Sequence, residues 1–257
     1  MRRRLEGKVA IVTGAGVGIG RAVCERFAEE GAEVVPTSRT REHLEETAAA
    51  VHRISGREPR SFVLDVRQGR SVERVVGEVG GDFGRIDIVC NNAGIELPHA
   101  PPVERVTDEE WESVFRVNVT GMFRVCRAAL RFMGDGGSIV NLGSMNSFVA
   151  WPNDAPYTAS KGAVLQLSRA LAVDLAQRNI RVNCVCPGII DTPLTRSFID
   201  AADDADATVA EYEAVAPLRR MGTAREVANC VVFLASDEAS FVTGAALLVD
   251  GGSTAAG

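Results

Sequence analysis

Short apolar runs rich in β-branched residues recur along the chain, and each is typical of a strand buried on both faces. The first, residues 8–13, ends at a glycine-rich stretch, after which a helical pattern continues to Gly31. Six further runs lie at 33–37, 61–66, 86–90, 138–142, 180–186 and 245–249. Helical patterns separate these runs, and two of them begin with a capping-box motif, Thr107-x-x-Glu110 and Thr223-x-x-Glu226.

This alternation predicts parallel strands joined by right-handed crossovers, with helices on both faces of the sheet. We therefore predict an α/β fold, a single Rossmann-like doubly wound domain over residues 1–257 with a seven-stranded parallel sheet. No linker, repeat or abrupt change of composition divides the chain. Residues 187–218 interrupt the rhythm, and we predict no strand there. Because ligands bind outside the carboxyl ends of such strands, we expect a substrate lid at about 188–218.

Composition narrows the class of protein. Hydrophobic residues make up 46% and charged residues 24%, which is typical of a globular protein. The 28 Lys and Arg against 34 Asp and Glu give a formal net charge of −6, which argues against non-specific nucleic-acid binding. No apolar run approaches the ~20 residues that span a bilayer. The basic start at 1–4 is followed by Glu6 and Lys8 instead of an apolar signal segment, so we expect a cytoplasmic protein without a membrane partner.

The six cysteines form no Cys-x-x-Cys pair, and we expect reduced thiols in the core. Cys184 and Cys186 are two positions apart, so on a strand both side chains point to one face. None of the three histidines has a partner at metal-ligand spacing, and we expect no metal site. We expect His99 on an exposed loop rather than in a site.

The glycine-rich segment at 13–20 stands where a phosphate-binding turn belongs, between the first strand and the first helix. Glycine lets the backbone approach a pyrophosphate, and a helix N-terminus supplies free N–H donors. The spacing Gly14-x-x-x-Gly18-x-Gly20 differs from the common Gly-x-Gly-x-x-Gly fingerprint and lacks the ending of a Walker loop. Glycine-rich turns also serve packing alone, but this position favours dinucleotide binding.

The end of the second strand predicts which dinucleotide binds. Ser38 occupies the position where NAD enzymes tend to carry an acidic residue, and Arg39 follows it. No carboxylate repels a 2′-phosphate there, and a guanidinium can grip it. We therefore predict that NADP(H) is preferred over NAD(H), with Arg39 as a merely solvated loop residue as the alternative.

Tyr157 and Lys161 are four positions apart in a helical pattern, which places them on one helix face. Lowering the pKa of a tyrosine by about 3 units needs roughly 4 kcal/mol. An ammonium about 4 Å away at an effective dielectric constant of about 20 supplies that amount. Ser144 follows the strand at 138–142, where its hydroxyl can hold a substrate oxygen beside Tyr157. Such a pair alone is commonly two surface residues, but the combination favours general acid/base catalysis.

Taken together, these motifs resemble the short-chain dehydrogenase/reductase family over essentially the whole chain. The matching motifs are Thr13-Gly14-Ala15-x-x-x-Gly18-Ile19-Gly20, Leu64-Asp65-Val66, Asn91-Asn92-Ala93-Gly94, Asn118, Ser144, Tyr157-x-x-x-Lys161 and Pro187-Gly188 with Thr192. The spacing resembles that of the compact members, not of the longer epimerase and dehydratase branch or of the Tyr-x6-Lys enoyl reductases.

The resemblance implies a catalytic tetrad. Tyr157 would be the acid/base, Ser144 would orient the carbonyl, Lys161 would bind the nicotinamide ribose, and Asn118 would hold a water behind the lysine. The remaining cofactor contacts would come from Gly14, Gly16, Val17, Gly18, Ile19, Gly20, Ser38, Arg39, Asp65, Val66, Asn91, Ala93, Gly94, Pro187, Gly188, Ile190 and Thr192. Asn91 could instead bridge two strands, and Asp65 could cap the next helix. Val17 stands where NADP-preferring relatives are commonly basic, which weakens the NADP prediction.

The function that this resemblance implies is NAD(P)(H)-dependent hydride transfer between nicotinamide C4 and a secondary alcohol or ketone. The alternatives are a non-catalytic dinucleotide-binding sensor on the same fold and, less compatible with the short substrate region, an epimerase or dehydratase. Met145, Asn146 and Trp151 are candidate substrate contacts, together with Glu96, Leu97, Phe148 and the segment 194–212. The resemblance further implies a homotetramer, with the helices after Asn118 and Tyr157 at one interface and the C-terminal segment at another.

Overall fold

A computed structural model describes residues 3–97 and 101–256, and His99 therefore lies outside the described residues. Seven strands form one sheet in the order β3-β2-β1-β4-β5-β6-β9, and all neighbouring strands are parallel. The strands are β1 (Val9–Thr13), β2 (Glu33–Ser38), β3 (Phe62–Val63), β4 (Ile88–Asn91), β5 (Ser138–Leu142), β6 (Arg181–Pro187) and β9 (Ala246–Val249). The predicted seven-stranded parallel α/β sheet is thus confirmed.

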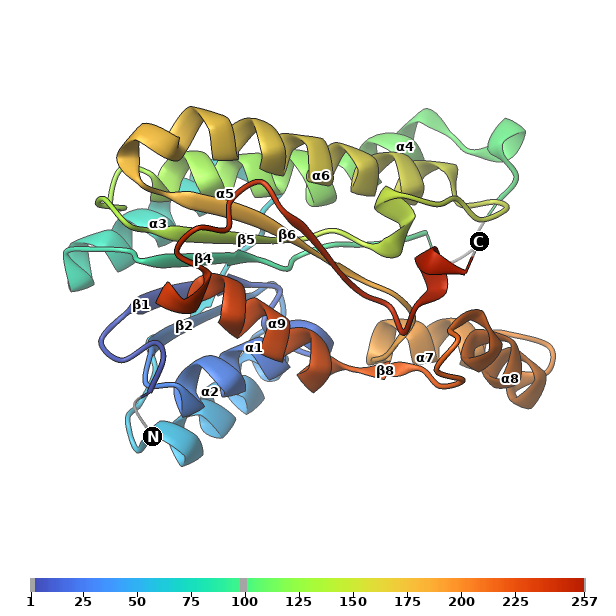
Figure 1. Cartoon of the computed structure of the whole chain (residues 1–257), viewed down its shortest axis with the longest axis horizontal. Coiled ribbons are helices and arrows are strands. Elements are labelled where there is room, and N and C mark those ends of the chain that lie inside the picture. Colours follow the sequence, from blue (N-terminus) through green and yellow to red (C-terminus); the bar gives the residue numbers. More distant parts are fainter. Residues whose placement is uncertain (1–2, 98–100, 257) are drawn as a thin grey trace.

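Helices cover both faces of this sheet (Figure 1). One layer holds α1 (Gly18–Glu29), α2 (Arg41–Ser55) and α9 (Ala224–Ala235). The other holds α3 (Gly69–Phe83), α4 (Asp108–Phe115), α5 (Met122–Ala129) and α6 (Ala155–Leu175), with a π-helical turn at Arg116–Gly121 between α4 and α5. The helices α7 (Pro193–Asp200) and α8 (Ala205–Val215) lie at one end of the sheet, apart from both layers (Figure 1).

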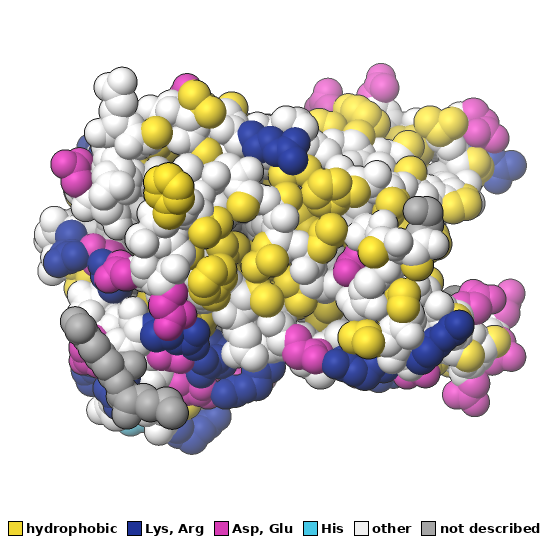
Figure 2. All heavy atoms as spheres, in the orientation of Figure 1, with side chains coloured by type: hydrophobic (Ala, Val, Ile, Leu, Met, Phe, Trp, Pro, Cys, Tyr) yellow, Lys and Arg dark blue, Asp and Glu magenta, His cyan; other side chains and the backbone are white. Residues whose placement is uncertain are grey.

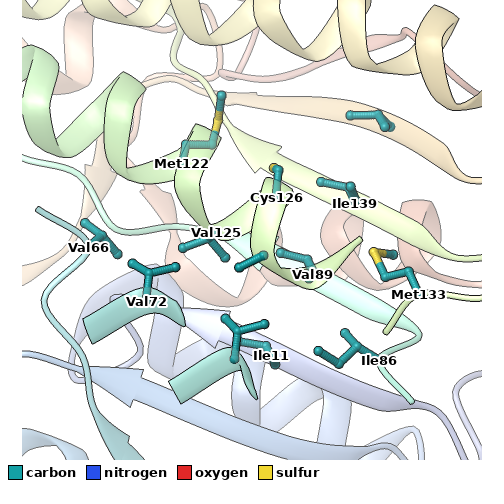
Figure 3. Packing of buried hydrophobic residues seen from close by; sticks show 14 of the residues in the cluster. Ile11, Val66, Val72, Ile86, Val89, Met122, Val125, Cys126, Met133 and Ile139 are labelled. Carbon is teal, nitrogen blue, oxygen red and sulfur yellow. The ribbon is translucent and has the colours of Figure 1, made fainter. Parts of the chain in front are cut away.

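Alternate residues of each strand pack into two separate cores. Val9 and Ile11 of β1 belong to the core under α3, α5 and α6, whereas Ala10 and Val12 face α1 and α9. Figure 3 shows part of the first core, where Ile11, Val89 and Ile139 from three neighbouring strands gather with residues of α5. The period of two along a strand explains why apolar residues occupy consecutive positions of a buried strand, since alternate side chains enter the two cores.

The strands end in register at one edge. Thr13 of β1 pairs with Thr37 of β2 and with Asn91 of β4, and Asn91 in turn pairs with Asn141 of β5. The loops that follow these strands therefore meet in one place. That place is the crevice where open α/β sheets bind ligands.

Two local predictions were wrong. The run at 61–66 forms a strand only over Phe62–Val63, because β3 is an edge strand that pairs with only the last two residues of β2. The segment 187–218, predicted without a strand, contains β7 (Ile190–Asp191), which pairs with β8 (Gly222–Thr223) outside the main sheet. The same segment holds α7 and α8, whose first turns are capped by the Thr192 and Asp204 side chains.

Other local predictions are confirmed. Both capping boxes form, at Thr107–Glu110 and Thr223–Glu226, and begin α4 and α9. All six cysteines are free, and all but Cys230 are buried.

No helix among the described residues is long and apolar enough to cross a membrane. On the face seen in Figure 2, hydrophobic side chains gather along the middle of the molecule, where β9 forms the edge of the sheet.

Candidate active site

A cavity of about 810 Å³ lies at the carboxyl ends of the strands. Its walls come from the glycine-rich loop, the loops after β2, β4 and β5, the start of α6, and the segment that carries β7, α7 and α8. A volume in this range is typical of pockets for cofactors and small molecules. The cavity therefore brings together motifs that are far apart in the sequence.

Ser144 lies just past β5, on the cavity wall. The preceding Gly143 donates its N–H to the Val185 carbonyl oxygen at 2.8 Å, which extends the pairing of β5 with β6. Ser144 then caps a 3-10 turn at Met145–Ser147, and its Oγ accepts a hydrogen bond from the Asn146 N–H at 3.1 Å. This turn fixes the hydroxyl oxygen and leaves its proton free for another acceptor.

The helix α6 presents Tyr157 and Lys161 to the same cavity. A buried polar contact anchors the helix to the sheet, because Asn141 Nδ2 on β5 donates to Ser168 Oγ at 2.8 Å. Lys161 Nζ donates to the Leu142 carbonyl oxygen at 2.8 Å and lies 5.3 Å from the centroid of the Tyr157 ring. The ammonium is thus held against one face of the tyrosine.

The groups around Tyr157 do not lower its pKa, contrary to the expectation from Lys161 alone. Burial raises the pKa of Tyr157 well above its usual value, and the negative charges of Glu96 and Asp154 add to this, while the Ser144 hydroxyl acts in the opposite direction. Burial also lowers the pKa of Lys161, because it disfavours the charged form of the amine. The phenol is therefore protonated at neutral pH in the protein alone.

Asn118 lies behind this pair, in the π-helical turn, and does not line the cavity. Its Oδ1 accepts from the Ile95 N–H at 2.8 Å, and its Nδ2 donates to the Ile95 carbonyl oxygen and to Ser160 Oγ, each at 2.9 Å. The side chain therefore clamps the loop after β4 to α6. Because these bonds use the side-chain amide of Asn118, a water bound here would have to donate its hydrogen bond to the Asn118 backbone carbonyl oxygen.

The glycine-rich loop leaves backbone open to the cavity. Gly14 has φ +64°, and a Cβ there would come within 2.8 Å of Ala93 Cα, so only glycine fits. A Cβ on Gly16 would come within 2.8 Å of Ser38 Oγ. The helix α1 begins after Val17 with no side-chain cap and no acidic residue in its first turn. Its first N–H groups are therefore available to an anion.

Hydrogen bonds from α1 and α2 hold this loop in place. Arg21 donates to the Gly16 carbonyl oxygen through Nε at 3.1 Å and Nη2 at 2.6 Å, and Thr47 Oγ1 donates to the Ala15 carbonyl oxygen at 2.8 Å. On the other side, Asn92 Nδ2 donates to the carbonyl oxygens of Thr13 and Gly14 at 3.1 and 2.9 Å. Asn92 lines the cavity. The sequence did not single it out, because the predicted contact in this motif was the adjacent Asn91.

Ser38 and Arg39, after β2, line the far end of the cavity together with His43. Arg39 is exposed and forms no ion pair with any residue in the described ranges. Asp65 also lines this end, where hydrogen bonds from Arg67 lower the pKa of its carboxyl group. The ion pair of Asp65 with Arg67, at 2.8 Å, keeps the carboxylate ionised beside the loop.

Most predicted cofactor contacts lie on the cavity wall, and only two do not. The contacts that do are Gly14, Gly16, Val17, Gly18, Ile19, Ser38, Arg39, Asp65, Val66, Ala93, Gly94, Tyr157, Lys161, Pro187, Gly188, Ile190 and Thr192. Gly20 lies behind the loop, where a Cβ would come within 2.3 Å of the Gly14 carbonyl oxygen. The Asn91 side chain bridges two strands, with Nδ2 donating to Asn141 Oδ1 at 2.9 Å.

The remaining wall is the candidate substrate region. Met145, Asn146 and Trp151, the predicted substrate contacts, line it together with Glu96. Asp154, which the sequence analysis did not single out, also lines it; its Oδ2 accepts from Asn146 Nδ2 at 2.6 Å and from Thr158 Oγ1 at 3.0 Å. Tyr212 of α8 also lines the cavity. Among the described residues, no group of His, Cys, Asp and Glu is arranged to hold a metal ion.

Known proteins share this architecture. A family model described as enoyl-(acyl carrier protein) reductase matches residues 14–254. The 2-(R)-hydroxypropyl-CoM dehydrogenase of Xanthobacter autotrophicus is 41% identical, over 96% of this chain and 99% of that protein. A 3-oxoacyl-acyl-carrier-protein reductase of Thermotoga maritima is 38% identical, over 97% of this chain and 98% of its own.

Among solved structures, levodione reductase superposes with a TM-score of 0.94 at 34% identity, covering 99% of this chain and all of that chain. The likeness extends over both the sheet and the cavity-lining segments, since the matches span nearly the whole chain. The chain therefore belongs to the short-chain dehydrogenase/reductase family and is an NAD(P)-dependent oxidoreductase of alcohols and ketones.

Proposed function

We propose that this protein interconverts a secondary alcohol and a ketone with NADP(H), using Ser144, Tyr157 and Lys161 as its catalytic groups. The observation that carries the proposal is the convergence of a protonated phenol, an ammonium and a fixed hydroxyl on one cavity beside an open helix N-terminus. Assays of ketone reduction and alcohol oxidation with NADP(H) test it directly.

In ketone reduction, the Ser144 hydroxyl donates a hydrogen bond to the substrate oxygen and Tyr157 gives that oxygen its proton. The raised pKa keeps Tyr157 protonated, as an acid requires. In alcohol oxidation, the Tyr157 phenolate accepts the hydroxyl proton, and the Lys161 ammonium against its ring stabilises the phenolate. A bound nicotinamide cofactor supplies or accepts the hydride at C4.

The residues around the cavity fit a dinucleotide. The glycine-rich loop has no room for larger residues. A Cβ on Gly16 would lie within 3 Å of side-chain atoms of Ser38 and His43, and a Cβ on Gly14 would lie within 3 Å of the Ala93 backbone. The uncapped start of α1 would bind the diphosphate, and Lys161 would bind the nicotinamide ribose. Asn118 would position the loop after β4 through its two bonds to Ile95.

The preference for NADP(H) rests on the end of β2. Ser38 and Arg39 line the cavity there, and the exposed Arg39 guanidinium would pair with a 2′-phosphate. His43, on the first turn of α2, places its imidazole at the same end of the cavity. Asp65 lies nearby, but its carboxylate forms an ion pair with Arg67.

The segment 188–218 would act as a substrate lid within a single domain. It lines the cavity through both α7 and α8, which stand apart from the two helix layers (Figure 1). We also infer a cytoplasmic homotetramer. Phe241 is fully exposed and Leu248 partly exposed along the β9 edge, and Trp111 and Phe123 are exposed on α4 and α5. Both surfaces would be covered by further copies of the chain.

The alternative, a dinucleotide sensor without catalysis, accounts for the glycine-rich loop alone. It gives no reason for a half-buried tyrosine and a buried lysine held together beside a serine hydroxyl. The relatives and structural neighbours are enzymes, and catalysis is the function that fits both findings.

A further inference from the structure

Glu96 is a carboxylate on the wall of the catalytic cavity that the chemistry described above does not use. It follows Ile95, whose backbone N–H and carbonyl are both held by the Asn118 amide at 2.8 and 2.9 Å. The backbone at Glu96 is therefore fixed to α6 through Asn118 and Ser160.

The charge of Glu96 acts on cavity-lining groups of two different helices. It raises the pKa of Tyr157 on α6, in addition to burial, and it acts in the same way on Tyr212 of α8. It also favours the charged form of Lys161. Glu96, Tyr157 and Tyr212 therefore line one cavity and are close enough for the Glu96 charge to act on both phenols.

No residue in the described ranges gives the Glu96 carboxylate a hydrogen bond or an ion pair, and burial raises its pKa to about 7. The neighbouring Asp154 differs, since Asn146 and Thr158 both donate to its carboxylate. Glu96 is half-buried and lines the cavity, so its carboxylate, which has no donor among the described residues, is free to accept a hydrogen bond from a ligand.

We propose that Glu96 binds a second hydroxyl of the substrate, close to the reacting carbon, and so selects polyhydroxylated alcohols and their hydroxyketones. This inference rests on the proposed alcohol/ketone oxidoreduction and deepens it. An anionic substrate would be repelled by Glu96 and Asp154, which both line this wall. A cationic substrate would be repelled by the Lys161 ammonium in the same cavity. A neutral hydroxyl meets neither obstacle and donates the missing hydrogen bond.

A matched pair of substrates tests the proposal, namely cyclohexanol and cis-cyclohexane-1,2-diol, each oxidised with NADP⁺ and with NAD⁺. The wild-type protein should have a higher kcat/KM for the diol. Glu96→Leu should lower that kcat/KM by about tenfold to a hundredfold, which is the range for a hydrogen bond to a charged group. Oxidation of cyclohexanol should instead improve, because loss of the Glu96 charge lowers the pKa of Tyr157. Glu96→Gln, which keeps an acceptor, should lose less. Glu104→Gln makes the same change at an exposed glutamate outside the cavity and should leave the diol preference intact.

Thermal unfolding of the same variants separates binding from structure. Glu96→Leu should unfold at the wild-type temperature or above it, because the variant loses a charge that has no protein donor. An equal diol-to-cyclohexanol ratio in the wild type and Glu96→Leu, or a marked fall in the unfolding temperature of Glu96→Leu, would overturn the inference alone. Failure of the wild type to oxidise either alcohol and to reduce the matching ketones would overturn the proposed function, and this inference with it.

Discussion

Tyr157 and Glu96 line the same cavity, where burial and then the negative charge of Glu96 raise the pKa of the Tyr157 phenol. Lys161 lies against the tyrosine ring, but its own pKa is lowered by burial. The protein alone therefore favours the protonated tyrosine. Alcohol oxidation, which needs the phenolate, is expected to depend steeply on pH.

The variant Glu96→Gln tests this relationship. Removing the carboxylate removes a repulsion that acts only on the phenolate, so the pKa of Tyr157 should fall. The rising limb of kcat against pH for oxidation of a simple secondary alcohol should then move to lower pH. An unchanged limb, or one moved to higher pH, would show that Glu96 does not act on Tyr157. Glu104→Gln, at an exposed position outside the cavity, serves as the control.

Arg39 is predicted to select the cofactor. Replacing it with alanine should weaken NADPH binding by about tenfold to over a hundredfold, because one charge-assisted contact to the 2′-phosphate is lost. NADH binding should stay unchanged. Fluorescence titration of the reduced cofactors measures both affinities, and Arg53→Ala, on the last turn of α2, removes an equal charge away from the cavity. A parallel loss for NADPH and NADH would assign Arg39 another role.

Glu30 is predicted to contribute stability that depends on pH. Hydrogen bonds from Arg4, and more weakly from Arg26, lower its pKa from 4.5 to about 2, while burial opposes them. Because the folded-state pKa is below the unfolded value, the stabilisation is complete above about pH 4.5. It is lost as the pH falls towards 2.

Urea unfolding of Glu30→Gln measures this contribution. At pH 7 the variant should lose about 1–2 kcal/mol of unfolding free energy, a value reduced for the solvent that screens the pair. Near pH 2.5 the difference from the wild type should be much smaller. Glu78→Gln breaks an exposed pair with Arg74 and should cost well under 1 kcal/mol at both values. A Glu30→Gln loss that is independent of pH would contradict the linkage.

Strands, caps and glycines were predictable because their causes are local. The apolar runs around Ile11, Val89 and Ile139 mark strands wherever both faces are covered, and Thr223 with Glu226 caps α9 as its spacing requires. The short pairing of Ile190 with Gly222 was not predictable, because it joins two segments that are far apart in the sequence and carry no local strand signal.

The site shows the same division. Tyr157, Lys161 and Ser144 were predictable because spacing and strand position place them. The direction in which adjacent side chains point was not predictable from the sequence. Asn91 turns towards Asn141, whereas Asn92 supports the glycine-rich loop, and only the register of β4 decides between them. The pKa of Tyr157 depends on Asp154, which is close to it in the sequence, and on Glu96, which is far from both. Only the fold brings Glu96 to the same cavity.

The central claim is that Tyr157 transfers the proton, and Tyr157→Phe tests it most directly. The variant keeps the ring against Lys161 but has no proton to give, so kcat for ketone reduction should fall by about a hundredfold to ten-thousandfold. Titration should show nearly unchanged NADPH binding, and Tyr212→Phe, at the only other tyrosine, should lose far less activity. Turnover by Tyr157→Phe at the wild-type rate, with cofactor bound as before, would contradict the account.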